Sequence, residues 1–314
     1  MRKPSNHRSS HKDRSQATSG ATSQATMAAE SEKLQKILAR GGVGSRRGVE
    51  KLIEQGRVSV NGKPAKLGDR ASVHDAIEVD GQRIKATRLA PQLTRVLLYN
   101  KPEGEVCTRD DEQNRPTVFA ALPRIINSRW ISVGRLDLNT SGLLLFTNNG
   151  ELASRLMHPS EELSRVYSVR VYGKLDDAKI AQLKKGVELE DGRASFDQIS
   201  RLPQQESDVA NQWLKVSLKE GRNREVRRLF EAVGLQVNRL IRTRYGDMPL
   251  PRDLRQGKTR ELTWKQVNEL LASVSLPPDP RPDKANLPQS DATRKRLKSQ
   301  PGSQSGARKG SKRR

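Results

Sequence analysis

The chain has 314 residues, of which 33% are hydrophobic and 30% charged, and its formal net charge at pH 7 is +23. This length is enough for two compact domains with tails, and a basic surplus of this size indicates a polyanionic partner. A single cysteine excludes an intramolecular disulfide and a cysteine-based metal cage. There is neither an apolar run long enough for a membrane span nor the apolar core of a signal peptide, so we expect a cytoplasmic protein.

The two ends of the chain differ in composition from its body. Residues 1–30 are polar and basic, with almost no large apolar side chains, and residues 277–314 begin with prolines and continue as a polar, basic tail. Such segments bury too little surface to offset the entropy of ordering, so we expect both to be disordered. The tails hold only part of the charge, so the body between them is basic in its own right.

The first folded region, expected over 31–84, is a small module of short elements. Apolar residues at helical spacing follow Ser31, a candidate N-cap, and this helix should end at Gly41-Gly42. Ser45 is placed to cap a second helix that stops at Gly56. Val58 and Val60 then alternate with polar residues before Asn61-Gly62, which is a hairpin signal.

The charges of this module lie at positions that the helical pattern leaves exposed. A solvated helix face is the ordinary explanation of such a run, but the order of elements from Lys33 to Gly62 resembles an S4 RNA-binding domain. The resemblance implies that two basic helices lie along the backbone of a structured RNA. The residues expected to contact RNA are Lys33, Lys36, Arg40, Arg46, Arg47 and Lys51.

Residues 85–93 are interpreted as a linker, and a second domain is expected over 94–276. Strand-like segments recur at 96–98, 130–133, 143–146, 167–172 and 213–218, with helical patterns at 180–186 and 224–233. Strands and helices do not alternate regularly enough for a doubly wound parallel sheet. We therefore expect an α+β fold with a mixed, mostly antiparallel sheet and flanking helices.

The segment from Gly134 to Gly150, GRLDLNTSGLLLFTNNG, carries the clearest functional signal. An Asp in a polar turn usually bonds its own backbone, but this segment resembles the signature motif of the RNA pseudouridine synthases, most closely the ribosomal RNA branch with an S4 domain. The resemblance implies that Asp137 is the catalytic nucleophile. Gly134 and Gly142 should permit the tight loop that carries it.

Two further segments resemble motifs of the same family. In EGRNREVRRLF, from Glu220 to Phe230, a basic face adjoins an apolar one, which by itself indicates only a solvated helix. The resemblance implies that Arg227 binds the catalytic aspartate and that Arg224 faces the substrate; a guanidinium suits a carboxylate because it can bind it bidentately. In the strand around Tyr167, ordinarily a packing position, it implies that this phenol stacks on the target uracil and is a candidate base.

The remaining expected site residues rest on shorter matches to motifs of the family. Leu240 matches the apolar residue that packs on the other side of the base, although an ordinary core leucine is nearly as plausible. Arg135 would fill the space that a flipped uridine leaves in the RNA. Lys101, in a Lys-Pro pair that resembles the family's first motif, is expected to support the site and is counted with Arg135, Leu240 and Arg224 as substrate-binding. Cys107 is interpreted as a small packing residue.

The resemblance as a whole implies a monomeric isomerase that converts one uridine of a 23S ribosomal RNA hairpin to pseudouridine. The substrate is either free RNA or a large-subunit assembly intermediate. The reaction involves no net oxidation, so we expect neither a metal nor another cofactor. The alternatives are a non-catalytic rRNA-binding factor, an isomerase for small-subunit rRNA or tRNA and, least favoured, a basic regulator.

Overall fold

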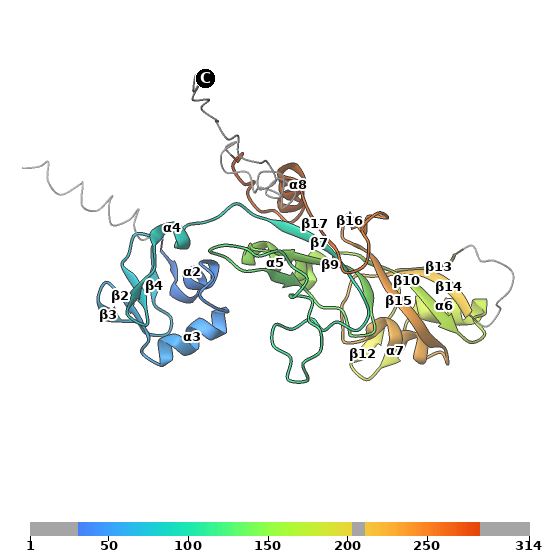
Figure 1. Ribbon diagram of the computed structural model, residues 1–314. Helices are drawn as coiled ribbons and strands as arrows, with labels where there is room; N and C mark the ends of the chain where they lie inside the picture. Colours follow the sequence, from blue (N-terminus) through green and yellow to red (C-terminus); the bar gives the residue numbers. More distant parts are fainter. Residues whose placement is uncertain (1–30, 203–210, 283–314) are drawn as a thin grey trace, which may run out of the picture. The chain divides into compact units, whose positions relative to one another are not determined.

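The computed structural model describes residues 31–202 and 211–282, and the two tails expected to be disordered lie largely outside these ranges. Within them, no helix is long and apolar enough to cross a membrane. The first region consists of short elements (Figure 1). These elements are β1 (Glu32–Lys33), α2 (Leu34–Arg40), α3 (Arg46–Glu54), β2 (Val58–Val60), β3 (Lys63–Pro64), β4 (Arg70–Ala71), β5 (Ile77–Val79), β6 (Gln82–Arg83) and α4 (Ala86–Leu89).

The predicted helix, turn, helix and hairpin of this module are present. The Ser45 hydroxyl accepts a hydrogen bond from Gly48 N and so caps α3, because the first amides of a helix have no partner within it. Asn61 and Gly62 both have positive φ, as a tight hairpin turn between β2 and β3 requires. The apolar faces of α2 and α3 meet the four-stranded sheet β3-β2-β5-β6 in one core.

Two details of this module differ from the prediction. The N-cap of α2 is Lys33, without a side-chain cap, because Glu32 and Lys33 pair with β4 as a short strand, so Ser31 does not cap the helix. The expected linker contains α4, whose Leu89 is fully buried in the core of the module. The module therefore extends through α4, since an apolar side chain in a short polar segment found a core to pack against.

The second region is built around one mixed sheet in the order β13-β14-β10-β15-β9-β7-β17, with β8 also paired to β9 and β16 to β15. Its strands are β7 (Val96–Lys101), β8 (Ile131–Val133), β9 (Ser141–Thr147), β10 (Arg165–Tyr172), β13 (Gln198–Arg201), β14 (Asn211–Leu218), β15 (Gln236–Tyr245), β16 (Met248–Pro249) and β17 (Thr259–Glu261). A separate hairpin joins β11 (Val187–Leu189) and β12 (Gly192–Ala194). The α+β class and the mostly antiparallel sheet are as predicted.

The sheet is buried on both faces. Leu97 and Tyr99 of β7 belong to one apolar cluster, whereas their neighbours Val96 and Leu98 belong to another, as the twofold period of a strand requires. Helices cover both faces of the sheet. The first cluster includes residues of α6 (Asp177–Lys185) and α7 (Glu225–Glu231), and the second includes residues of α5 (Gly150–Met157) and α8 (Trp264–Ser273); a short 3₁₀ turn, η1 (Pro159–Glu161), follows α5.

The parallel contact between β9 and β15 holds the two halves of the sheet together. Gly142 lies opposite Arg242 there, with φ of +103°, and a Cβ atom on Gly142 would lie 2.3 Å from the Arg242 carbonyl oxygen. Only glycine allows so close an approach of two backbones. The loop with Asp137 ends at this junction, so the close approach fixes where that loop enters the sheet.

Candidate active site

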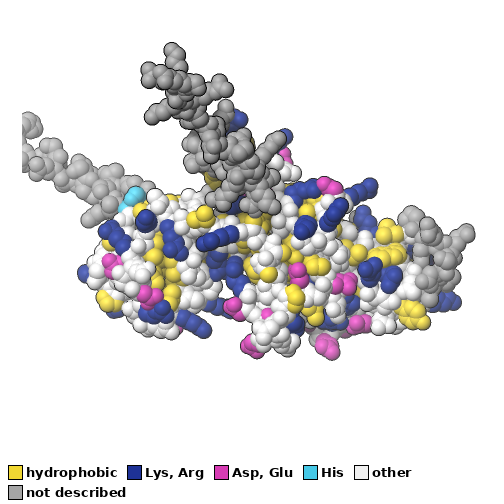
Figure 2. All heavy atoms as spheres, viewed as in Figure 1, with side chains coloured by type: hydrophobic (Ala, Val, Ile, Leu, Met, Phe, Trp, Pro, Cys, Tyr) yellow, Lys and Arg dark blue, Asp and Glu magenta, His cyan; other side chains and the backbone are white. Residues whose placement is uncertain are grey.

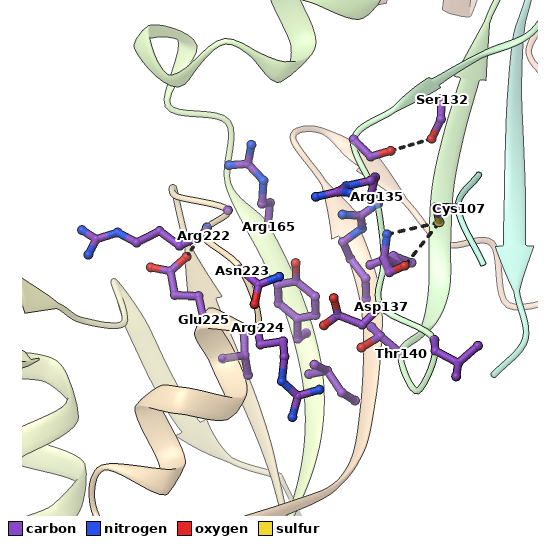
Figure 3. Close-up of a pocket in the computed structure, with 18 of the residues that line it drawn as sticks. Cys107, Ser132, Arg135, Asp137, Thr140, Arg165, Arg222, Asn223, Arg224 and Glu225 are labelled. Carbon is purple, nitrogen blue, oxygen red and sulfur yellow. Dashed lines mark hydrogen bonds between the residues drawn. The ribbon is translucent and has the colours of Figure 1, made fainter. Parts of the chain in front are cut away.

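A cavity of about 790 Å³ lies over the middle of the sheet. One wall is the loop 134–140 between β8 and β9, and the opposite wall is the loop that leads into α7. Figure 3 shows Arg135, Asp137 and Thr140 on the first wall and Asn223, Arg224 and Glu225 on the second. Segments more than 80 residues apart in the chain thus face each other across one hollow.

Asp137 lies on a tight turn within this loop. Gly134 has φ of +76°, and Thr140 N donates a hydrogen bond of 3.1 Å to the Asp137 carbonyl oxygen. Among the described residues, no donor bonds the Asp137 carboxylate, which lines the cavity. The turn therefore uses the backbone of Asp137 and leaves its side chain to the cavity, unlike a turn-stabilising aspartate.

Lys101 holds the loop from inside the protein. Its side chain is fully buried, and Nζ donates to the carbonyl oxygens of Pro102, Asp137 and Thr140 at 3.0, 3.1 and 2.9 Å. A fourth contact, to Leu138 O, is 3.4 Å long. Burial lowers the pKa of Lys101. Its geometry is that of the structural support that the sequence predicts. Since it does not line the cavity, the expectation that it also binds substrate is wrong.

Arg227 also bonds the backbone of the loop. Nη2 donates to Asn139 O at 2.7 Å and Nη1 donates to Val237 O at 2.9 Å. Across the described ranges no ion pair of 4.0 Å or less joins Arg227 to Asp137, so the expected bidentate pair is not formed here. The guanidinium bonds two backbone carbonyl oxygens instead, and its Nε is buried without a partner. Burial lowers the pKa of Arg227, and the charge of Asp137 offsets part of this effect.

Cys107 also bonds the backbone of this loop, which the sequence did not suggest. Its Sγ donates to Leu136 O at 3.3 Å and accepts from Leu136 N at 3.4 Å, as the dashed lines in Figure 3 show. Burial raises the pKa of this thiol. The interpretation as a simple packing residue is therefore incomplete, because Cys107 bonds both polar groups of the residue before Asp137. No sequence signal marked it, since its partner is 29 positions away.

Tyr167 and Leu240 come from adjacent strands of the sheet. Both are buried, at 8% and 4% exposure, and both line the cavity. Leu240 also belongs to the main apolar cluster. It is therefore both a core leucine and part of the cavity wall, the two positions that the sequence allowed. The structure thus brings Asp137, Tyr167 and Leu240 to one cavity from positions 103 residues apart.

Arginines surround the cavity. Arg135 and Arg224, both expected at the site, are exposed and line it, and Arg224 is the left-handed residue that precedes α7. Arg165 and Arg242, which the sequence analysis did not single out, also line it. They lie in strands with an ordinary alternating pattern, so nothing in the sequence distinguished them from solvated strand residues.

The basic residues of the first module fall into two groups. Lys33, Arg46, Arg47 and Lys51 are exposed. Arg40 is not free for RNA, because Nη1 bonds Glu32 at 2.6 Å and Nε bonds Leu89 O at 3.0 Å; it joins α2 to α4 instead. Lys36 also pairs with Glu32, at 2.9 Å, and stays half exposed. The prediction that all six residues lie on an open face is therefore wrong for Arg40.

The wider surface is rich in Lys and Arg, with fewer acidic side chains between them (Figure 2). Within the described ranges, no group of three or more His, Cys, Asp or Glu side chains could hold a metal ion. The ionisable groups of the cavity thus include the Asp137 carboxylate without a hydrogen-bond partner, two carboxyl groups that accept hydrogen bonds (Asp111 and Glu225), the Cys107 thiol, a phenol and several guanidinium groups.

Comparisons with known proteins agree with this arrangement. Residues 32–77 match the S4 domain, and residues 95–232 match the family described as RNA pseudouridylate synthase. Ribosomal large subunit pseudouridine synthase B of Escherichia coli (strain K12) is 59% identical over 251 residues, which cover 79% of this chain and 85% of that protein. The protein of the same name from Yersinia pestis is 58% identical over 247 residues, covering 78% of this chain and 77% of the relative.

A solved structure extends the likeness to the fold. The crystal structure of a pseudouridylate synthase superposes with a TM-score of 0.52 at 27% identity, covering 76% of this chain and 99% of the other. Identity above one half over most of the chain, together with the cavity that contains Asp137, leaves one assignment. The chain belongs to the RNA pseudouridylate synthases of the large-subunit ribosomal RNA branch, with an S4 domain at its N-terminal side.

Proposed function

We propose that this protein converts one uridine of 23S ribosomal RNA to pseudouridine, with Asp137 as the nucleophile. The observation that supports this most is the state of Asp137. Its carboxylate lines the cavity without a partner among the described residues, while Lys101, Cys107 and Arg227 hold the backbone around it. A carboxylate left free on so firmly held a loop is available to a ligand.

The reaction breaks the N1–C1′ bond of a uridine, turns the base and joins it to C1′ through C5. An anionic group near C1′ lowers the barrier to the first step, as the nucleophilic carboxylate does in glycoside hydrolysis. In our proposal, an oxygen of Asp137 bonds C1′ while the electron pair of the broken bond leaves with N1. C5 then displaces the carboxylate, C5 loses its proton, and N1 gains one.

Tyr167 and Leu240 would hold the base during this turn. Both are buried cavity residues, and an aromatic ring on one side with an aliphatic chain on the other suits a flat pyrimidine. The base must first leave its stack, which costs a few kcal/mol. The exposed Arg135, two residues before Asp137, would fill the space that the base vacates and so lower this cost.

The S4 domain would supply affinity. Its exposed cations suit contacts with RNA phosphates, and the names of the relatives point to the large ribosomal subunit. We propose further that the protein acts as a monomer in the cytoplasm. Free 23S RNA and an assembly intermediate are both compatible with such a binding surface.

The test is release of tritium from C5 of uridine in 23S RNA transcripts, for the wild type and for Asp137→Asn. We expect release by the wild type and none by the variant, with RNA affinity retained. The matched control is Asp111→Asn. Asp111 also lines the cavity, but its carboxylate is held by Arg115 at 2.7 Å, so this variant should keep its activity.

Three results would contradict parts of the proposal. Release by Asp137→Asn would remove Asp137 as the nucleophile. Release from 16S RNA or tRNA but not from 23S RNA would move the target. Tight binding of rRNA without release from any transcript would favour the non-catalytic factor.

A further inference from the structure

Arg242 is the buried cation of the cavity whose bonds are incomplete. It lies in β15, is 2% exposed and lines the cavity with Asp137 and Tyr167. Nε donates to Leu143 O at 2.7 Å, but Nη2 is buried and has no hydrogen-bond partner. A buried donor left without an acceptor destabilises the protein, so a ligand that supplies an acceptor recovers this free energy.

The fold holds Arg242 rigidly between the two candidate catalytic elements. In the sheet it lies opposite Tyr167 of β10 on one side and opposite Gly142 of β9 on the other. Its guanidinium carbon is 5.0 Å from the centre of the Tyr245 ring, whose hydroxyl donates to Leu156 O at 2.6 Å. A guanidinium fixed by a backbone bond and an aromatic face is preorganised, and thus costs little to order when a ligand binds.

Neither Asp137 nor a phosphate suits the free amino group. The Asp137 carboxylate is already present in the cavity, yet among the described residues it does not pair with Arg242. A phosphodiester would have to lose its hydration to reach a side chain that is 2% exposed, whereas the exposed Arg135 and Arg224 can bind it at the rim without that loss. A neutral carbonyl oxygen can enter at much lower cost.

The base of the target nucleotide carries two such oxygens. We infer that Arg242 is a catalytic residue whose free amino group donates a hydrogen bond to a carbonyl oxygen of the flipped uracil. This inference rests on the proposed function. When the N1–C1′ bond breaks, its electron pair stays on N1, and the resulting uracil anion spreads its charge over N1 and the two carbonyl oxygens. A fixed cation at one of these oxygens stabilises the anion more than the neutral base, which accelerates the step.

The test combines a protein variant with changes of single atoms in the RNA. Single-turnover release of C5 tritium is measured for the wild type and Arg242→Gln, with uridine, 2-thiouridine or 4-thiouridine at the target position. With uridine we expect Arg242→Gln to react about 10²-fold more slowly, as for the loss of one preorganised donor, and to bind RNA almost as well.

The thio substitutions separate contact with the base from damage to the fold. Sulfur is a weak acceptor, so at the contacted position it should slow the wild type about tenfold. The same substitution should leave Arg242→Gln almost unchanged, because its bond is already absent. The ratio of the rates with uridine and with a thiouridine, taken within one variant, does not depend on how much of that variant is folded. If Arg242→Gln does not fold, Arg242→Met replaces it, since an unbranched apolar side chain suits this buried position and also lacks the donor.

The outcomes of this test separate the inference about Arg242 from the proposed function. Equal slowing of the wild type and the variant by both thio substitutions would overturn the inference and leave the proposed function intact; an ordered water on Nη2 would give this result. A wild type that releases no tritium from any uridine RNA would instead overturn the proposed function.

Discussion

The S4 domain and the catalytic domain are both rich in Lys and Arg, but these cations contact different groups. In the S4 domain, Lys33, Arg47 and Lys51 are exposed to solvent. Around the Asp137 loop, Lys101, Arg227 and Arg242 are buried and donate to backbone carbonyl oxygens. An exposed cation can attract RNA at long range, whereas a buried one can fix a loop to a fraction of an ångström. In our proposal, the same residue types therefore supply affinity for RNA in one domain and hold the position of the loop in the other.

The largest effect is expected for a change in the buried cations around the Asp137 loop. In Lys101→Met, the carbonyl oxygens of Pro102 and Thr140 lose the Nζ donor, at about 1–3 kcal/mol each. We expect urea unfolding to show a loss of about 2–6 kcal/mol in the free energy of unfolding. Tritium release should fall by about 10²-fold, because displacement of the loop misplaces Asp137, the nucleophile of our proposal.

The control for this variant is Lys184→Met, on the exposed side of α6. It should change the stability by no more than about 0.5 kcal/mol and leave the activity intact. If Lys101→Met were as stable as the wild type, the buried cation would not hold the loop.

An intermediate effect is expected for the exposed group. The triple variant Lys33→Gln, Arg47→Gln and Lys51→Gln should bind 23S transcripts more weakly, and the slope of log affinity against log salt should become shallower by about 2–3. Turnover of bound RNA and the melting temperature should not change, because these side chains stabilise neither the loop nor the core.

Arg57 provides the matched control. Asp80 binds its guanidinium at 2.6 and 2.8 Å, so Arg57→Gln removes a charge that is already neutralised and should leave the salt slope as it is. An unchanged slope in the triple variant would remove these three residues from the RNA-binding surface.

The smallest expected effect concerns Glu225, a buried carboxyl group on the far wall of the cavity. Burial raises its pKa above the ordinary 4.5, and one of its oxygens has no partner. Since the folded state binds the Glu225 proton more tightly than the unfolded state, the contribution of Glu225 to stability is fully present below pH 4.5. This contribution is lost as pH rises through the raised pKa. Glu225→Gln, which can still accept from Arg222 N, should therefore raise the melting temperature at pH 8.

The same variant has a built-in control in its pH dependence. The gain over the wild type should shrink as pH falls towards 4.5, where Glu225 becomes protonated and resembles the amide. A gain that is equal at pH 8 and pH 5 would mean that the ionisation of Glu225 does not cause it.

Local patterns in the sequence were sufficient for the elements that depend on neighbouring residues. Ser45 caps its helix and Asn61-Gly62 closes its hairpin as predicted, because a cap and a tight turn involve only a few consecutive residues. The strand at 143–146 was also predicted, since a buried strand is an unbroken apolar run. Ser31 failed as a cap because a strand partner 39 residues away, β4, competed for the start of the helix.

The sequence by itself determined the fold class and the S4 domain, because their signals are patterns of consecutive residues; the roles of Asp137, Tyr167 and Arg227 are predictions from motifs of the same kind. Only the tertiary structure decided what these residues contact. It placed Arg227 on a backbone carbonyl, Cys107 on both polar groups of Leu136, and Arg242 between two strands with a free donor. Such contacts join atoms from distant segments, and no local pattern records them, because they exist only once the sheet brings β9, β10 and β15 together.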